Sequence, residues 1–320
     1  MFFSIIIPVY NRPDEIRELL ESLVKQRYKN FEVIIIEDGS EVRCDEIVTS
    51  FEKHLSIRYI FQNNTGQGFA RNKGMELALG DYYVLFDSDC VIPASYLEIV
   101  YQQIQQRALD AYGGPDQADQ DFSPFQKAIN YSMTSLFTTG GIRGKLKDPG
   151  KYQARGFNMG ISKRAFQATG GFIDPNKAED IELSIRLKKM GFKLELIKEA
   201  FVYHKRRNTF SSFLKQSYSF GRNRVNVSRF HPEAVQLVHF LPLFFLLGVL
   251  SIPLLYIFNP NLYLFALTVL LLWCAVVILD STIKNHSLYI GLISLPVAVG
   301  QLFSYGLGLG VEGVKRLAKG

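Results

Sequence analysis

Two carboxylates separated by one residue are the sharpest chemical feature of this 320-residue chain. Asp87 and Asp89 follow the apolar run Tyr82–Phe86, which predicts a buried strand, so both side chains leave its end on the same side. Without a partner the two groups would repel and hold a first proton tightly. Mg²⁺ or Mn²⁺ removes that conflict, because these cations prefer carboxylate, phosphate and water oxygens. The pair is therefore a candidate metal site.

Strands and helices alternate along the residues that must position this pair. Apolar runs predict buried strands at 4–9, 31–36, 57–61 and 82–86. Helical patterns begin at Pro13 and over residues 69–79. Such alternation predicts an α/β fold with a doubly wound, mostly parallel sheet, whose ligands bind at the carboxyl ends of the strands.

Each predicted strand is followed by a polar loop. One such loop is ordinary turn chemistry, and Asp-Gly-Ser at 38–40 is a common turn. Four polar loops at one edge of one sheet are better explained by a ligand site.

The C-terminal third of the chain is suited to lipid. Uncharged or nearly uncharged runs cover residues 234–258, 262–280 and 287–310, and each is long enough to cross a hydrocarbon core of about 30 Å. Three buried helices of a soluble protein are the alternative, but three such runs in succession exceed the usual length of core helices. We therefore expect about three transmembrane helices.

The basic residues are concentrated just before these runs. The formal net charge is +6, and residues 204–232 hold no acidic residue but seven basic ones, Lys205, Arg206, Arg207, Lys215, Arg222, Arg224 and Arg229. This local belt argues against a nucleic-acid-binding face and places the N-terminal part in the cytoplasm by the positive-inside rule. Three spans would put Lys315, Arg316 and Lys319 outside, against the same rule, so the third segment could instead be re-entrant or interfacial.

Several motifs, in this order, resemble family 2 glycosyltransferases of the GT-A fold over roughly residues 2–222. They are Ser4-Ile-Ile-Ile-Pro-Val-Tyr-Asn-Arg, Val33-Ile-Ile-Ile-Glu-Asp-Gly-Ser, Asn64-Thr-Gly-Gln-Gly-Phe-Ala-Arg-Asn-Lys-Gly, Gly80-Asp-Tyr-Tyr-Val-Leu-Phe-Asp-Ser-Asp, Gly156-Phe-Asn-Met, Gly170-Gly-Phe and Glu179-Asp-Ile-Glu-Leu-Ser-Ile-Arg-Leu. The hydrophobic tail is similar to that of membrane-anchored bacterial exopolysaccharide glycosyltransferases.

The resemblance implies that a sugar passes, with inversion, from a nucleotide-diphosphate donor to an acceptor hydroxyl. It implies that Asp38 contacts the base of the nucleotide, that Asp87 contacts the ribose or the metal, and that Asp89 binds Mg²⁺ or Mn²⁺. It also implies that the nucleotide pocket is lined by Pro8, Tyr10 and Arg12, with Arg71 nearby. UDP is the nucleotide we expect, because Asp38 suits the imide of uracil, although thymine and guanine also offer N–H groups.

The resemblance places the catalytic base on Asp180. A carboxylate across from a metal could take the proton of the attacking hydroxyl. The structural alternative is an acid pair, Glu179-Asp180, that only stabilises the start of an amphipathic helix. His204, after a strand-like run at 193–203, is a possible metal ligand, because a histidine in several family members contacts the metal or the diphosphate. The alternative is an exposed polar residue.

Residues 208–230 predict an amphipathic helix lying on anionic lipid. Processive synthases of the family carry Gln-x-x-Arg-Trp here, whereas this chain has Gln216-Ser-Tyr-Ser-Phe220. The missing Arg and Trp favour the addition of one sugar.

We therefore expect three parts, a GT-A catalytic domain at 1–205, an interfacial segment at 206–232 and a transmembrane domain at 233–320. The expected function is hexosyl transfer to a lipid-linked saccharide, in surface polysaccharide synthesis at the cytoplasmic face of the inner membrane. Homo-oligomerisation is possible. The alternatives are transfer to polyprenyl phosphate itself and a non-catalytic nucleotide-sugar-binding subunit of an export complex.

Overall fold

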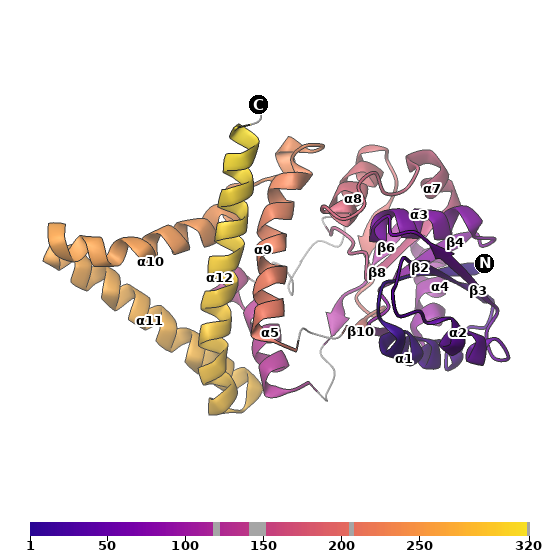
Figure 1. Ribbon diagram of the computed structural model, residues 1–320, viewed down its shortest axis with the longest axis horizontal. Helices are drawn as coiled ribbons and strands as arrows, with labels where there is room; N and C mark the ends of the chain where they lie inside the picture. Colours follow the sequence, from indigo (N-terminus) through magenta and orange to yellow (C-terminus); the bar gives the residue numbers. More distant parts are fainter. Residues whose placement is uncertain (118–121, 141–151, 205–207, 319–320) are drawn as a thin grey trace. The chain divides into compact units, whose positions relative to one another are not determined.

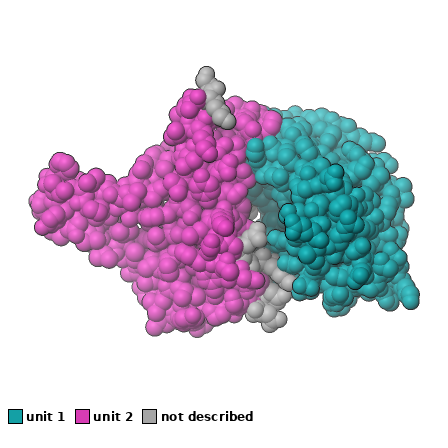
Figure 2. All heavy atoms as spheres, viewed as in Figure 1, with its two compact units in different colours: residues 1–119, 147–205 teal, residues 120–146, 206–320 magenta. Residues whose placement is uncertain are grey.

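The computed structural model describes residues 1–117, 122–140, 152–204 and 208–318. The chain forms two compact units (Figure 2), one of residues 1–119 and 147–205 and one of residues 120–146 and 206–320. Residues 120–146, expected within the catalytic domain, thus group with the C-terminal helices. Four residues discussed above, Lys205, Arg206, Arg207 and Lys319, lie outside the described part of the chain.

The first unit is built on a seven-stranded sheet with the order β3-β2-β1-β4-β8-β6-β9. Its strands are β1 (Phe3–Val9), β2 (Phe31–Asp38), β3 (Ile57–Gln62), β4 (Tyr82–Phe86), β6 (Ala111–Gly113), β8 (Asn158–Ser162) and β9 (Leu194–Leu196). The first four are parallel, and only β8 runs antiparallel to its neighbours β4 and β6. The α/β sheet expected from the alternating pattern is confirmed.

Helices cover both faces of this sheet (Figure 1). They are α1 (Pro13–Val24), α2 (Asp45–Phe51), α3 (Gln67–Leu77), α4 (Tyr96–Arg107), α7 (Lys163–Thr169) and α8 (Glu179–Lys189). Ile5 and Ile7 pack in one core with α1, α2 and α4, whereas Ile6 packs in a second core with α3, α7 and α8. Successive side chains of a strand point to opposite faces, so a strand between two helical layers is apolar at most positions.

A second sheet of three short strands has the order β5-β10-β7. Its strands are β5 (Cys90–Val91), β7 (Asp116–Gln117) and β10 (Val202–His204). The single strand expected at 193–203 is therefore wrong, since β9 and β10 belong to different sheets. The chain turns between them, where Ala200 N donates to Ile197 O at 3.3 Å.

The second unit is helical. It contains α5 (Pro124–Thr134), α6 (Leu136–Thr139), α9 (Phe210–Val227), α10 (Leu241–Phe258), α11 (Pro260–Asn285) and α12 (Leu288–Leu317), with 3₁₀ turns at Pro232–Ala234 and Leu237–Phe240. The helix expected near 208–230 is α9, and its apolar side is buried only in part, since Phe210 is 41% exposed. Phe213 is buried with residues of α5 and α12, among them Ile129 and Val297.

Within the described residues, three helices are long and apolar enough to cross a membrane, Leu237–Phe258, Pro260–Asn285 and Leu288–Leu317. Their mean hydropathies are 2.4, 2.8 and 1.6. The third is one continuous helix through Pro296 and extends beyond residue 310. It also differs from the others in that 39% of its most apolar 18-residue stretch is buried inside the protein, against 0% and 6% for the first two helices.

We predict that Gly74→Ala destabilises the first unit. A Cβ at Gly74 would overlap the side chain of Ile6 in β1, and overpacking of a core costs about 1–3 kcal/mol, more than the helix preference of alanine returns. Gly313→Ala in α12 is the matched control, since a Cβ there meets nothing within 4 Å. Thermal unfolding should show a lower Tm for Gly74→Ala only, and equal Tm values would contradict the packing described here.

Candidate active site

The Asp-Ser-Asp turn lies where β4 ends and β5 begins. Asp89 forms an ion pair with Arg12, the residue that precedes α1. It also contacts His204, whose Nε2 lies 3.0 Å from Asp89 Oδ1. Arg12, Asp89 and His204 are thus brought together from three distant parts of the sequence.

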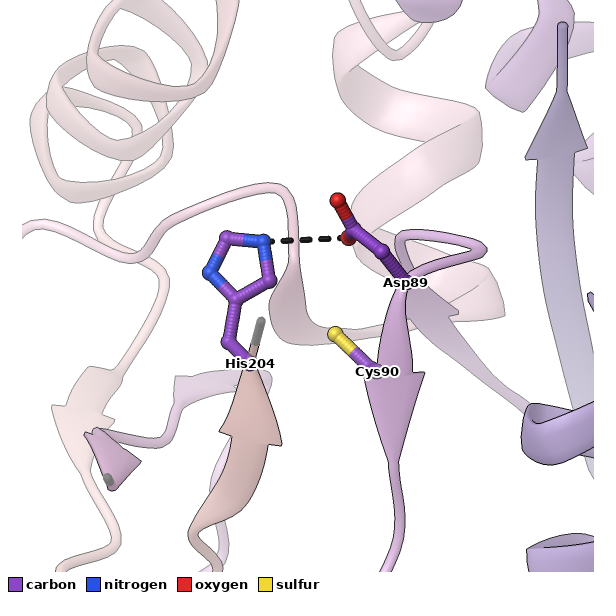
Figure 3. Close-up of side chains that lie close together, drawn as sticks. All are labelled: Asp89, Cys90 and His204. Carbon is purple, nitrogen blue, oxygen red and sulfur yellow. Dashed lines mark ion pairs between the residues drawn. The ribbon is translucent and has the colours of Figure 1, made fainter. Parts of the chain in front are cut away.

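The small sheet explains why His204 reaches this turn. Its strand β10 pairs antiparallel with β5 in a register that sets His204 opposite Cys90, the residue after Asp89. Figure 3 shows the His204 ring directed at the Asp89 carboxylate, with the Cys90 thiol beside it. The ring of Phe157 stacks on His204 at a centroid distance of 4.8 Å and an interplanar angle of 15°, which limits rotation of the imidazole.

The residues present fit a hard divalent cation. Asp89 Oδ1 is buried and accepts no hydrogen bond of normal geometry from the described residues, although His204 Nε2 is close. An orphaned carboxylate oxygen beside an imidazole nitrogen is a donor set that Mg²⁺ or Mn²⁺ accepts. The Cys90 thiol completes a cluster whose ligand atoms lie within 4.8 Å of one another, but sulfur suits softer metals.

Electrostatics keep Asp89 ionised. Burial by itself raises the pKa of Asp89, yet the contacts with His204 and Arg12 outweigh burial and hold that pKa well below its usual range. Burial alone would lower the pKa of His204, but the neighbouring Asp89 carboxylate outweighs this effect, so the pKa of His204 is raised. Burial, reinforced by Asp89, raises the pKa of the Cys90 thiol, which therefore stays protonated.

A second group of charges is centred on Arg71 of α3. Its guanidinium is 1% exposed and lies 2.5 Å from Asp87 Oδ1 and 3.4 Å from Glu179 Oε1. Gly156 is required here, because a Cβ at that position would lie 2.7 Å from the Arg71 guanidinium. Arg71 thereby joins the Asp-Ser-Asp turn to the start of α8, where the predicted base is located.

The two acids of the predicted base position have different surroundings. Glu179 is buried, and Gln67 Nε2 donates to its Oε1 at 2.6 Å. Burial, together with the adjacent Asp180 and against the attraction of Arg71, raises the pKa of Glu179 to about 7. Asp180 is only half-buried, and it accepts the backbone N–H groups of Gly156 at 3.3 Å and of Ile181 at 2.7 Å. Asp180 is thus the more accessible carboxylate.

Asp38 is engaged within the chain. Its side chain is 3% exposed and accepts the backbone N–H groups of Thr65 and Gly66, at 2.9 and 2.8 Å, and the Gln62 amide at 2.8 Å. In this structure Asp38 fixes the loop that leads into α3. Pro8 is half-buried at the end of β1, and Tyr10, 52% exposed, follows the strand.

Sequence reasoning missed Asn158 as a positioning residue. Its fully buried amide donates to Ala200 O at 2.8 Å and to Pro115 O at 3.3 Å, and it accepts the hydroxyl proton of Tyr96 at 2.5 Å. These carbonyls precede β10 and β7, so Asn158 holds the strand that carries His204. The only available signal was its place in the motif Gly156-Phe-Asn-Met.

Comparisons with known proteins agree with this arrangement. A family model described as Glycosyl transferase family 2 matches residues 4–170. The protein named Glycosyltransferase GlyG of Streptococcus pneumoniae serotype 4 is 30% identical over 139 residues, which cover 42% of this chain and 46% of that protein. The uncharacterized glycosyltransferase EpsJ of Bacillus subtilis is 34% identical over 111 residues, 34% of this chain and 32% of that protein. The chain therefore matches less than half the length of these relatives.

Two solved structures share the fold. The mannosyltransferase PcManGT of Pyrobaculum calidifontis, in complex with GDP-Man and Mn²⁺, superposes with a TM-score of 0.70 at 14% identity, covering 98% of this chain and 86% of that one. TarS 1–349 of S. aureus in complex with UDP-GlcNAc superposes with a TM-score of 0.51 at 20% identity, covering 75% and 69%. The GT-A fold expected from the sequence motifs is confirmed.

We predict that the stability of the protein depends on pH through Glu179. Its pKa in the folded state, about 7, lies above the ordinary value of 4.5, so folding favours the protonated form, and this stabilisation is lost as pH rises from about 4.5 to 7. Glu179→Gln resembles the protonated acid at every pH. Between pH 5 and 8 the free energy of unfolding of the wild type should fall by up to about 3 kcal/mol relative to that of Glu179→Gln.

Thermal unfolding of both proteins across that range measures the difference. Glu52→Gln, at an exposed glutamate after α2, controls for the loss of one charge. A difference between wild type and Glu179→Gln that does not change with pH would contradict the burial of an ionisable Glu179.

Proposed function

The chain belongs to glycosyl transferase family 2, and on that premise we propose that it transfers one sugar from a UDP-sugar to a hydroxyl group of a lipid-linked saccharide, with inversion. The observation that carries the proposal is the buried Arg71, which contacts Asp87 on one side and Glu179 on the other. A single guanidinium thereby ties the candidate donor-binding turn to the helix start that carries the candidate base.

The donor end of the site consists of Asp87, Asp89 and His204. Asp89 and His204 would hold Mg²⁺ or Mn²⁺, and a cation there supplies Lewis-acid stabilisation of the charge that develops on a leaving diphosphate. Arg12, paired with Asp89, orients that carboxylate and adds positive charge to the same end. Pro8, Tyr10 and Asp38 would line the nucleotide pocket, Asp38 mainly through the loop that it fixes.

The acceptor end of the site is Asp180. Its two oxygens are oriented by the N–H groups of Gly156 and Ile181, and each keeps a lone pair free for the proton of the acceptor hydroxyl. Removal of that proton as the oxygen attacks the face opposite the leaving nucleotide gives inversion. Glu179, largely protonated below its pKa of about 7, limits the negative charge next to Asp180.

The proposed donor and acceptor are supported by separate observations. UDP-GlcNAc is bound in the TarS structure, and GDP-Man with Mn²⁺ in the PcManGT structure, so a nucleotide-sugar and a metal suit this fold. Helices apolar enough to span a membrane follow the sheet unit, which favours an acceptor anchored in the bilayer. The basic residues of α9 favour the cytoplasmic face of the inner membrane as the location of the reaction, and we propose that the reaction serves surface polysaccharide synthesis.

Nucleotide binding tests the donor site. Calorimetry on the detergent-solubilised full chain with UDP, GDP and TDP should show binding of UDP that Mn²⁺ strengthens at least about tenfold, equivalent to 1.4 kcal/mol. Asp89→Asn should lose that metal dependence, because it removes the orphaned Oδ1 charge. The control Asp45→Asn, at an exposed position in α2, should behave as wild type. Metal-dependent binding of GDP alone would show that the donor is a GDP-sugar and not a UDP-sugar. No binding of any nucleotide would refute the donor site.

Turnover tests the base. Asp180→Asn should lower transfer to a lipid-linked saccharide by about 10²- to 10⁴-fold, the usual contribution of a general base, while its nucleotide Kd stays that of wild type. Asp45→Asn again serves as control. Unchanged turnover in Asp180→Asn would refute the assignment, and complete inactivity of the wild type would favour a binding subunit. A product labile to mild acid would identify a sugar phosphodiester and hence polyprenyl phosphate as the acceptor.

A further inference from the structure

We propose that only α10 and α11 cross the bilayer, as a hairpin, and that α12 lies along the membrane surface beside α9, in contact with lipid. The inference concerns how the helical unit meets the membrane, and it is independent of the reaction proposed above.

Helices α10 and α11 form one inserted hairpin. A single residue, Asn259, separates them, and neither carries a charged side chain between residues 241 and 279. Their 18 and 26 residues correspond to about 27 and 39 Å, close to or above the thickness of a hydrocarbon core. None of the most apolar window of α10 is buried in the protein, and only 6% of that of α11. Uncharged surfaces of this length are suited to lipid.

Both open ends of this hairpin rest on α12. A Cβ at Gly306 would lie 2.7 Å from the carbonyl oxygen of Pro242, at the start of α10, and a Cβ at Gly291 would lie 2.8 Å from the carbonyl oxygen of Ile278, near the end of α11. Figure 1 shows α10 and α11 converging at their joined ends, away from α12. The start and end of a spanning hairpin lie at the same membrane face, so Gly291 and Gly306 also do.

The helix between these two points must then follow that face. Gly306 lies fifteen positions after Gly291, which corresponds to about 22 Å of helix. If α12 crossed the membrane instead, the two contact points would differ in depth by about that length. The hairpin would then be tilted too far for α10 to reach the opposite face.

Charged neighbours on one side of α12 support the same orientation. Along its second half, Arg222 of α9 lies 3.0 Å from Glu312, and Arg316 donates to the hydroxyl of Ser228. Near its first half, Asp280 and Lys284 form an ion pair at 2.7 Å at the end of α11. Leu214 of α9 lies against Gly300, near the middle of α12, so a spanning α12 would carry the adjacent Lys215 into hydrocarbon, where charged side chains are rare and costly.

Another side of α12 is apolar and exposed. Four residues at helical spacing lie along it, Tyr289, Leu292, Leu307 and Val314, each between 51% and 67% exposed. An amphipathic helix with one charged and one apolar side is the form that lies in a membrane interface. Arg316 and Lys315 then lie on the same face as Arg222, which removes the conflict with the positive-inside rule that three spans create.

Cysteine labelling in sealed membrane vesicles tests the topology of the full chain. Lys315→Cys reports the end of α12, Asn261→Cys the tip of the hairpin, and Lys53→Cys the sheet unit, all three positions being exposed. Wild type sets the background, because Cys44 and Cys90 are buried and Cys274 lies in α11. Labelling after detergent solubilisation confirms that each introduced thiol is reactive.

With a membrane-impermeant maleimide, Lys315→Cys and Lys53→Cys should be labelled in vesicles of the same orientation, and Asn261→Cys only in vesicles of the opposite orientation. Labelling of Lys315→Cys together with Asn261→Cys would show that α12 spans and overturn the proposal. Labelling of all three in one orientation would show that the hairpin does not cross, and would overturn it as well.

Discussion

The burial of one charge, the Arg71 guanidinium, constrains the whole candidate site. A buried cation without partners is strongly destabilising, so the fold must bring carboxylates to it from elsewhere. Asp87 arrives from the end of β4, and Glu179 from the start of α8. Gly156 leaves the space that the guanidinium fills. The positions of the turn that carries Asp89 and of the helix that carries Asp180 both follow from this requirement.

The central sheet could be predicted from the sequence because its strands are buried on both faces. The strands β1 and β4 and residues 33–36 of β2 are apolar at nearly every position, and the helices between these strands have one apolar side each. The short strands could not be predicted in this way. Two- and three-residue strands such as β5 and β10 have no periodicity of their own, and their pairing depends on contacts with distant segments.

The candidate site was predicted as a set of residues, and the structure adds their relationships. The Arg12–Asp89–His204 group needs a register between β5 and β10 that no local pattern contains. Asp38 shows the limit most clearly, because a buried carboxylate that fixes a loop and one that meets a ligand look alike in a sequence. The helical tail was identified by hydropathy alone, but the packing of α12 against α9 depends on closely fitted backbones, including that of Gly308 against Tyr218.

The pairing of β10 with β5 also has a consequence for the order in which the protein is made. Domains fold from the N-terminus as the chain leaves the ribosome. All residues of β1 to β4 and of the helices between them are available for folding once residue 86 has emerged. Asp89 must wait for His204, which is synthesised about 115 residues later. The residues of α9 and of the hairpin α10–α11 are synthesised soon after His204. The nascent chain thus completes the candidate site only when the apolar helices are about to be synthesised.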